Sequence, residues 1–330
     1  MPAIVVEDGF RRPLIIAHRG ASGVRPEHTL EAYDLAIAQG ADFIEPDVVS
    51  TKDGVLIARH ENEIGATTDV ATRFPQRKRV AIVDGVAVEG WFAEDFTIDE
   101  LRQMRARERV ATRSREFDGQ FGIPTLDEVL ALVRQRERET GRTIGVYPET
   151  KHPTYFQSIG LPLEDRLLEV LGRHGYRRAA DAVFIQSFET GNLLALSTRT
   201  PIRLVQLIDE RGAPYDLASS GDPRTYRYLV TPEGLREIAR YADAIGPAKS
   251  LVLPIHGAIA SQPTALVSDA HAAGLEVHIW TLRSDSPFLP ASYAGDPLAE
   301  WRRFAELGVD AMFGDFPADG VLALRQQPAR

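Results

Sequence analysis

Residues 14–49, LIIAHRGASGVRPEHTLEAYDLAIAQGADFIEPDVV, contain two short apolar runs separated by an amphipathic segment. The runs Leu14–Ala17 and Ala41–Val49 have the length and composition of buried strands, and Leu30–Gln39 carries apolar residues at helical spacing. Thr29 precedes this helix as its expected N-cap. A strand, a helix and a second strand in so short a stretch predict a βαβ unit with parallel strands.

The same alternation continues toward the C-terminus. Six further strand-like runs follow, at Thr143–Glu149, Ala182–Gln186, Ile202–Ile208, Ala242–Ile245, Glu276–Thr281 and Val309–Phe313. Amphipathic segments separate most of them, at Leu126–Thr140, Leu163–His174, Gly191–Ser197, Pro232–Arg240, Thr264–Ala273 and Pro297–Leu307. Eight strands alternating with helices predict an α/β fold of the (β/α)8 TIM-barrel type. A doubly wound sheet is the alternative, but the glycine-rich phosphate-binding motif that accompanies it is missing from the sequence.

Residues 61–124 interrupt this alternation. They combine polar and basic turns with the aromatic pair Trp91-Phe92 and a single helical pattern, Ile98–Arg107. Because this segment is too long for an ordinary βα loop, we expect one barrel domain, residues 1–330, with a small subdomain inserted after the second strand. Loops that follow barrel strands lie at the C-terminal rim, where barrel enzymes carry their active sites.

The composition limits the classes of function. The chain has 330 residues, a hydrophobic content of 44% and a net charge of −9. This charge repels nucleic acid and anionic membranes, so a phosphate-bearing substrate must be attracted by local cations or by a metal. Since the sequence contains no cysteine, disulfides, thiolate catalysis and zinc–thiolate sites are excluded.

The expected compartment follows from the absence of two kinds of apolar segment. Residues 1–9 do not resemble a signal peptide, and no apolar run approaches the ~18 residues of a membrane span. We therefore expect a cytoplasmic protein without stable membrane association, or a periplasmic or secreted one if a leader has been removed. The expected partner is a small-molecule substrate, and the sequence carries no signal for an oligomeric state.

Two strand ends carry residues suited to catalysis or to ligand binding. The first strand runs into His18-Arg19-Gly20, which places an acid/base group and a bidentate phosphate partner at the barrel mouth. The second ends in Glu45-Pro46-Asp47, and carboxylates two residues apart share one face of a strand. Two buried like charges are costly without a cation, and a hard divalent ion bound through oxygens removes that cost. The alternatives are an incidental histidine beside a surface arginine, and two exposed carboxylates at a frayed strand end.

A tight turn brings a second histidine to this carboxylate pair. Asp53-Gly54 lies between two apolar runs, which predicts a hairpin. A two-residue loop places His60 directly opposite Asp47, whereas a three-residue loop shifts the pairing by one residue and keeps His60 nearby. A third strand end offers Glu149 and Lys151 on one side, either as a metal ligand beside a cation or as a structural salt bridge.

These motifs, taken in order, resemble those of the glycerophosphodiester phosphodiesterases. The resemblance covers essentially the whole chain and rests on His18–Ala21, Pro26–Thr29, Glu45 and Asp47, His60, Tyr147–Lys151, Phe184–Phe188, Ile279–Thr281 and Gly308–Pro317. Thr68–Val70, Arg73–Pro75 and His278–Asp285 look most like the bacterial periplasmic-type branch of that family.

The resemblance implies a metal-dependent enzyme that hydrolyses glycerophosphodiesters to sn-glycerol 3-phosphate and an alcohol. It implies general acid/base roles for His18 and His60, and ligation of a divalent ion, Ca²⁺ before Mg²⁺, by Glu45, Asp47 and Glu149. It also implies that Arg19 and Lys151 contact the phosphate and that Glu27 supports the loop after the first strand.

Other positions bear on the pocket without defining the chemistry. Trp280 is expected either to wall the pocket or to fill the core, and His278 is expected to be a hydrogen-bonded interior histidine. Many members of the family have Asn at His28 and Asp at Glu61, departures that bear on substrate tuning more than on activity.

Three other functions are compatible with parts of the pattern. A phospholipase D-like lipid phosphodiesterase shares the fold and the histidine and metal set, but such proteins usually depend on disulfides. A barrel glycosidase also uses paired carboxylates, although on different strands and without two histidines and an arginine at one mouth. A non-catalytic binding protein would be expected to have lost His18 or His60.

Overall fold

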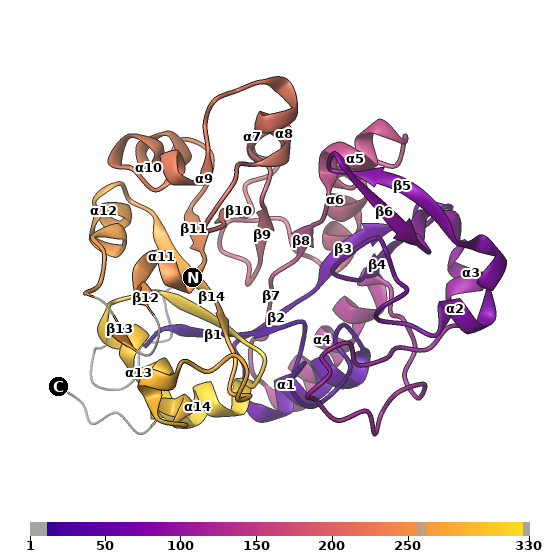
Figure 1. The fold of residues 1–330 in the computed structure, drawn as a ribbon, viewed down its shortest axis with the longest axis horizontal. Helices are drawn as coiled ribbons and strands as arrows, with labels where there is room; N and C mark the ends of the chain where they lie inside the picture. The colour runs from indigo at the N-terminus through magenta and orange to yellow at the C-terminus, as the bar shows by residue number, and fades with distance from the viewer. Residues whose placement is uncertain (1–11, 257–258, 261, 326–330) are drawn as a thin grey trace.

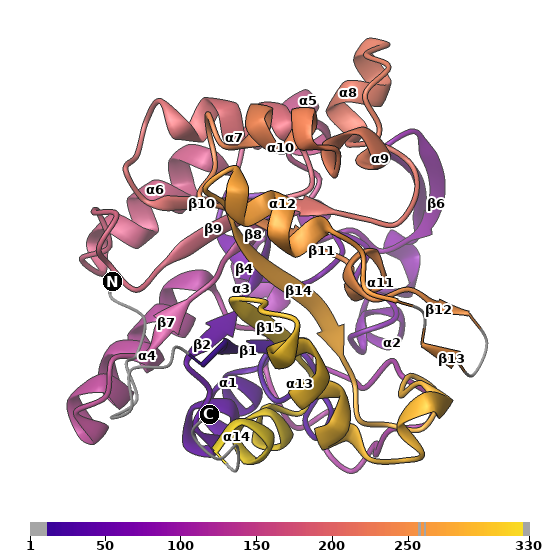
Figure 2. The same cartoon turned by 90° about the vertical axis from the view of Figure 1, so that its left-hand side faces the viewer.

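The structure is a computed structural model that describes residues 12–256, 259–260 and 262–325. The expectation about a leader falls on residues outside this range. Within the described residues, a parallel barrel is enclosed by helices (Figures 1 and 2). Each of its eight positions, here called a stave, is one strand or two consecutive strands in line. The staves are β1 (Leu14–His18), β2 (Phe43–Glu45) with β3 (Asp47–Ser50), β7 (Gly145–Val146) with β8 (Glu149–Thr150), β9 (Phe184–Ser187), β10 (Arg203–Ile208), β11 (Ala244–Pro247), β14 (Glu276–Leu282) and β15 (Ala311–Gly314).

Two neighbouring staves are each split by a proline. Pro46 separates β2 from β3 and Pro148 separates β7 from β8, because proline has no N–H to donate to a ladder. The pairing still continues through both breaks, since Glu149 N donates to Pro46 O (3.1 Å) and Gln186 N donates to Pro148 O (2.9 Å). The ring closes because β2 pairs with β7, β3 with β8, and β15 with β1, all in parallel. The predicted TIM-type barrel is confirmed.

Helices cover the outside of the barrel. The principal ones are α1 (Leu30–Gln39), α4 (Leu126–Thr140), α6 (Glu164–Arg173), α7 (Thr190–Ser197), α10 (Pro232–Ile238), α12 (Leu266–Ala272), α13 (Pro297–Glu306) and α14 (Pro317–Arg325). Shorter elements in the loops are α5 (Pro153–Ser158), α8 (Tyr215–Ser220), α9 (Tyr226–Leu229), α11 (Lys249–Val252), η3 (Ala291–Tyr293), β12 (Ile255–His256) and β13 (Ile259–Ala260). Among the described residues, no helix is long and apolar enough to cross a bilayer.

The barrel interior is filled by side chains from the staves themselves. Its buried cluster consists of Ile16, Phe43, Tyr147, Phe184, Val205, Ala244, Ala311 and Phe313. Gly145 is required beside this cluster, because a Cβ there would lie 2.1 Å from the Phe43 ring. His278 is fully buried and bonded to the Tyr147 hydroxyl (2.6 Å), as expected for an interior histidine. The packed interior thus supports the residues at the barrel mouth from below and holds them in fixed positions.

Residues 61–124 lie beside the barrel and reach its mouth (Figure 1). After β4 (Leu56–Ala58) they contain α2 (Val70–Arg73), η1 (Pro75–Arg77), the hairpin β5 (Arg79–Val83) and β6 (Val86–Gly90), η2 (Ala93–Asp95) and α3 (Ile98–Leu101). We infer that the described residues form one domain into which this segment is inserted. Among them its hairpin pairs with no barrel strand, and its Phe92 and Phe96 belong to the same buried cluster as residues of the strands and covering helices.

The helix expected at Ile98–Arg107 is wrong beyond its first turn. Helix α3 ends at Leu101, and Ala106 lies in an antiparallel bridge with Thr68. Ala106 N donates to Phe121 O (2.9 Å) and Arg107 N to Thr67 O (2.8 Å), so pairing within the inserted segment replaces the helical hydrogen bonds.

Candidate active site

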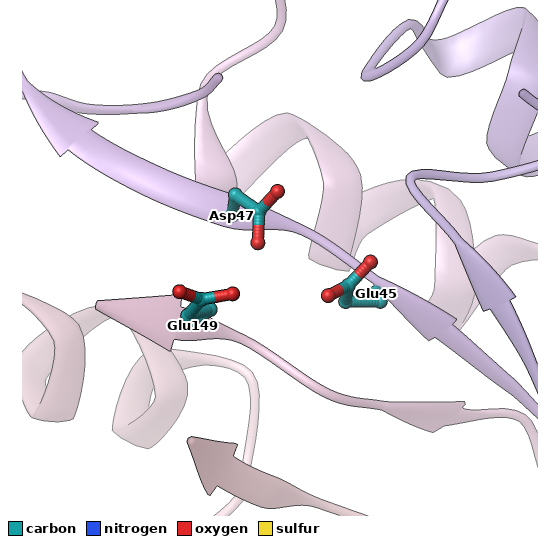
Figure 3. A group of neighbouring side chains, drawn as sticks. All are labelled: Glu45, Asp47 and Glu149. Atoms are coloured by element: carbon teal, nitrogen blue, oxygen red, sulfur yellow. The ribbon is translucent and has the colours of Figure 1, made fainter. Parts of the chain in front are cut away.

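Three buried carboxylates meet at the C-terminal end of the barrel (Figure 3). Glu45 and Asp47 come from the two halves of one stave, and Glu149 is the direct parallel neighbour of Asp47 on the next. One oxygen from each residue lies within 4.8 Å of the others. The strand period thus puts Glu45 and Asp47 on one face, as expected, and the barrel register adds Glu149.

The pKa values of these carboxylates reflect their burial and their proximity to one another. Burial, followed by the charges of Asp47 and Glu149, raises the pKa of Glu45 well above its usual range. Burial and Asp47 raise the pKa of Glu149 to about 8, against the opposing effect of Lys151. Burial acts in the same direction on Asp47, but the hydrogen-bonded His28 holds the pKa of that carboxyl well below its usual range. Without a cation, Glu149 therefore tends to retain its proton at neutral pH.

His18 ends β1 and is oriented by a carboxylate from the last stave. Its Nδ1 lies 2.5 Å from Oδ1 of Asp315, and both side chains are buried. Burial, followed by the charge of Arg19, lowers the pKa of His18 to about 4, although Asp315 opposes this. The imidazole is therefore neutral at pH 7, and its ionised partner assigns the proton to Nδ1. Nε2 is left with a lone pair that can accept a proton.

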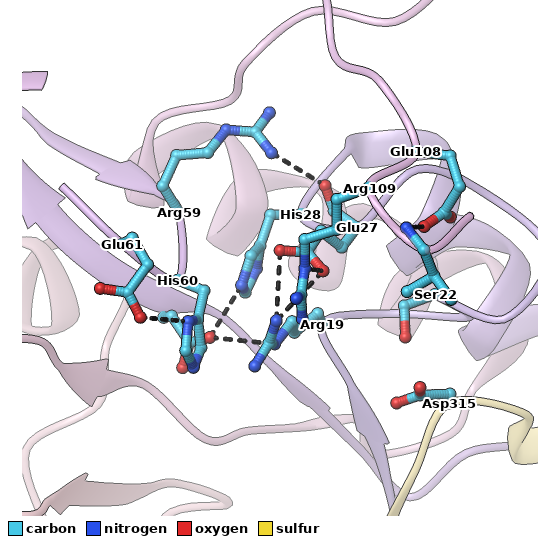
Figure 4. Close-up of polar contacts among 12 residues, drawn as sticks. Arg19, Ser22, Glu27, His28, Arg59, His60, Glu61, Glu108, Arg109 and Asp315 are labelled. Atoms are coloured by element: carbon cyan, nitrogen blue, oxygen red, sulfur yellow. Dashed lines mark hydrogen bonds and ion pairs between the residues drawn. The ribbon is translucent and has the colours of Figure 1, made fainter. Parts of the chain in front are cut away.

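Arg19 is fixed by the backbone and by two loops. Its φ is 61°, a left-handed conformation, and its N–H donates to Oε2 of Glu45 (2.9 Å). The guanidinium donates to Glu27 (3.1 and 3.2 Å), which also accepts from Arg109 (2.8 Å) (Figure 4). Gly20 follows with φ 85°, and a Cβ there would lie 2.7 Å from the Ala32 backbone. A tight turn packed against α1 thus aims Arg19 into the mouth.

The hairpin after β3 has the three-residue loop. Val48 pairs with Ala58 and Ser50 with Leu56, so Arg59 lies opposite Asp47, and the expected direct pairing of His60 with Asp47 is wrong. The physical reason is the turn itself: Thr51 N donates to Val55 O (2.9 Å), which leaves residues 52–54 as the loop.

His60 still reaches the site from this register. Its Nδ1 lies 2.7 Å from Oε1 of Glu61, and its Nε2 lies 3.3 Å from Nζ of Lys151. Partial burial, then the charges of Arg19 and Lys151, lower the pKa of His60 to about 3. Glu61 is itself anchored by His152 (2.9 Å), which also contacts Asp84 at the tip of the β5–β6 hairpin (2.6 Å).

A pocket joins these groups. It is lined by His18, Arg19, Glu45, His60, Glu149 and Gln186, with walls that include Phe188 and Trp280. Trp280 packs its edge against Phe188 and donates from its ring nitrogen to Gly246 O (2.7 Å), so it is a wall residue. Lys151 donates to Glu149 (2.8 Å), and the structural salt bridge therefore exists inside the site.

Five residues of the site were not expected from the sequence. Gln186 donates to Glu45 (2.9 Å), His28 contacts Asp47 (2.9 Å), Asp315 orients His18, and Arg113 and Arg283 both donate to Asp315 (2.5 and 3.0 Å). Gln186, His28, Asp315 and Arg283 stand in the stretches that carry the family resemblance, which is the signal that could have marked their contacts; only His28 was singled out there, for substrate tuning. For Arg113, inside the inserted segment, no comparable signal exists.

Comparisons with known proteins agree on one family. Residues 18–319 match the glycerophosphoryl diester phosphodiesterase family. A glycerophosphodiester phosphodiesterase of Arabidopsis thaliana is 35% identical over 92% of this chain and 84% of its own length. One from Haemophilus influenzae is 31% identical over 94% of this chain and 90% of its own length. A phosphodiesterase structure from Oleispira antarctica, in complex with the product sn-glycerol-3-phosphate, has a TM-score of 0.66 at 21% identity and covers 96% of this chain and 98% of its own.

Proposed function

Because this chain belongs to the glycerophosphoryl diester phosphodiesterase family and is a phosphodiesterase, we propose that it hydrolyses small glycerophosphodiesters with a divalent ion held by Glu45, Asp47 and Glu149. The proposed products are sn-glycerol 3-phosphate, the product bound by the Oleispira antarctica structure, and a free alcohol. The observation that carries the proposal is the cluster of three buried carboxylates, two of which line one pocket with two histidines whose Nδ1 atoms face carboxylates.

The carboxylate group fits a hard cation. Oδ1 of Asp47 and Oε1 of Gln186 are buried acceptors without a hydrogen-bond partner among the described residues. Burying such acceptors is costly unless something occupies them, and oxygen-only donors match Ca²⁺ or Mg²⁺. We favour Ca²⁺, which tolerates irregular carboxylate arrangements better than Mg²⁺ does. When bound, the ion would supply positive charge to the phosphoryl oxygens as a Lewis acid.

Two cations of the chain hold the diester anion. The Arg19 guanidinium and the Lys151 ammonium are both buried, and both keep their charge because neighbouring carboxylates raise their pKa values. A planar guanidinium binds phosphate oxygens through two parallel donors, whereas lysine acts as a point charge. With Glu27 bracing Arg19, the two cations would hold the phosphate beside both histidines.

The two histidines divide the proton transfers. One accepts the proton of the attacking hydroxyl through Nε2, and the other donates to the departing alcohol after taking up a proton, which the negative charge of the bound diester favours. Both present Nε2 to the pocket because Asp315 and Glu61 occupy their Nδ1 atoms. The carboxylates thus set tautomer and ring orientation for both groups.

The products of one diester test this function. Glycerophosphocholine is expected to give sn-glycerol 3-phosphate and choline in the presence of Ca²⁺, resolved by phosphorus NMR. Because the ion and both cations hold the glycerol phosphate, the bond between the phosphorus and the head-group oxygen is expected to break. Formation of phosphocholine and glycerol would contradict the proposed orientation, and no cleavage under any divalent ion would contradict the function.

Asp315→Asn is expected to lower kcat by up to about 10⁴-fold with little change in KM, because the amide favours the wrong tautomer of a histidine that transfers protons. Because Asp315 raises the pKa of His18, its neutralisation should also move the limb of the pH–rate profile that reports His18 to lower pH. Asp319→Asn, in the first turn of α14, where the carboxylate accepts from Ser284, is the matched control. A variant with wild-type kcat and pH profile would show that Asp315 has no positioning role.

A further inference from the structure

A second cavity adjoins the carboxylate pocket. It has a volume of about 90 Å³ and shares His18, Arg19 and Arg283 with the pocket that contains Glu45 and Glu149. The inserted segment contributes Arg109 and Arg113, and the loop after β14 contributes Phe288. We call this cavity, lined by Arg109, Arg113, Arg283 and Phe288, the arginine pocket. A phosphate held at Arg19 is therefore in reach of both cavities.

Two arginines of the arginine pocket have donors to spare. Arg113 uses most of its donors, since it donates to Ser22 O, Asp285 and Asp315. Arg109 uses only Nε, on Glu27, and Arg283 uses only Nε, on Asp315. Their Nη atoms contact no acceptor within the described part of the chain, and their side chains are 38% and 27% exposed. Both guanidinium edges are thus open to a ligand.

The acceptors of the arginine pocket are already occupied. Glu27 accepts from Arg19 and Arg109, and Asp315 accepts from His18, Arg113 and Arg283. Phe288 is the single aromatic ring in the lining, and the Arg283 guanidinium lies 4.8 Å from its centroid. Quaternary ammonium groups are bound by cages of several aromatic rings or by unpaired carboxylates, and the arginine pocket offers neither.

We propose that the arginine pocket binds the alcohol part of the diester and selects head groups rich in hydroxyl or carboxylate oxygens over quaternary ammonium head groups. The inference rests on the proposed function, which assigns the glycerol phosphate to the carboxylate pocket and leaves the arginine pocket to the departing alcohol. His18 lines both cavities, so it can reach the phosphate and an alcohol in the arginine pocket. Nη donors of Arg109 and Arg283 match acceptor oxygens on the head group.

The wild-type enzyme, loaded with Ca²⁺, is tested on two diesters that share the glycerol phosphate. Glycerophosphoglycerol carries only hydroxyl acceptors on its head group, and glycerophosphocholine carries a quaternary ammonium. We expect kcat/KM to favour glycerophosphoglycerol by about tenfold or more, the effect of one or two charge-assisted hydrogen bonds. Equal values, or a preference for glycerophosphocholine, would overturn the inference.

The variants Arg109→Gln and Arg283→Gln test whether these two arginines cause the preference for glycerophosphoglycerol. Each is expected to reduce the ratio of the two kcat/KM values about threefold to tenfold, mostly through KM for glycerophosphoglycerol. The ratio is an internal control, because a folding or catalytic defect lowers kcat/KM for both substrates alike. Arg73→Gln, which removes a charge from the inserted segment where Arg73 pairs with Asp69, should leave the ratio unchanged.

The possible outcomes separate this inference from the proposed function. A wild-type preference that survives in both arginine variants would show that selection occurs elsewhere and would refute the arginine pocket. Failure to cleave either diester would refute the proposed function instead.

Discussion

Replacement of His18 or His60 by alanine is expected to lower turnover by at least about 10²–10³-fold, the range for loss of a positioned acid or base. Both rings reach the pocket at the barrel mouth, above the packed interior, so the variants should fold and keep their helical content. Since one group accepts and the other donates a proton in the same displacement, the double variant should be little worse than the worse single variant. Steady-state kinetics on glycerophosphocholine measure the turnover of the two single variants and the double variant.

The control for this experiment is His271→Ala. His271 lies on α12, is ion-paired with Asp310 at the protein surface and lines neither cavity, so its loss should leave turnover unchanged. Near-wild-type turnover in the His18 or His60 variant would remove that residue from the chemistry, although the carboxylate cluster would remain a candidate metal site.

Glu149→Gln is expected to weaken binding of the divalent ion by more than the ~10–100-fold typical of a residue that only supports a ligand. The substitution keeps the shape of the side chain and removes one of three converging charges. In wild type, an ion that binds only the folded state raises Tm by mass action. In the variant this Ca²⁺-dependent rise should be largely lost, as measured by thermal unfolding across a Ca²⁺ titration.

The same variant gives a second readout without any ion. Because burial and Asp47 raise the pKa of Glu149, folding without an ion costs the free energy of protonating this side chain at neutral pH, and the neutral amide avoids that cost. In chelator, Glu149→Gln should therefore unfold at a temperature equal to or above that of wild type. Glu164→Gln, a buried glutamate bonded to Gln157 and Asn192 away from the pockets, is the matched control. A full Ca²⁺ response in Glu149→Gln would exclude Glu149 as a ligand.

The barrel was predictable because its signal is local. Each stave is a short apolar run and each main helix an amphipathic one, so α1 and α4 begin and end where the pattern places them. Helix α14 was missed because Pro317 resembles a turn residue, yet proline is also favoured in the first turn of a helix. The helical pattern after Leu101 failed for the opposite reason, since its backbone donors pair with distant segments of the chain.

The candidate site was predictable where ligands share a strand and not where they are brought together by the fold. Glu45 and Asp47 follow from a period of two, whereas the register of the hairpin depends on one extra loop residue at Lys52–Gly54. His18 and Asp315 are 297 positions apart, and they meet only because the last stave closes onto the first. Arg113 reaches Asp315 from the inserted segment, whose path over the mouth has no periodicity from which to infer it.

The most direct test of the central claim is turnover of a glycerophosphodiester by enzyme that has been stripped of metal and then reloaded. Glu45, Asp47 and Glu149 are predicted to hold an ion that the phosphodiester needs, so exhaustive chelation should abolish release of sn-glycerol 3-phosphate. Addition of Ca²⁺ or Mg²⁺ should restore release in wild type, while Glu149→Gln should require far higher ion concentrations. Turnover that persists unchanged in the fully stripped wild-type enzyme would contradict the account.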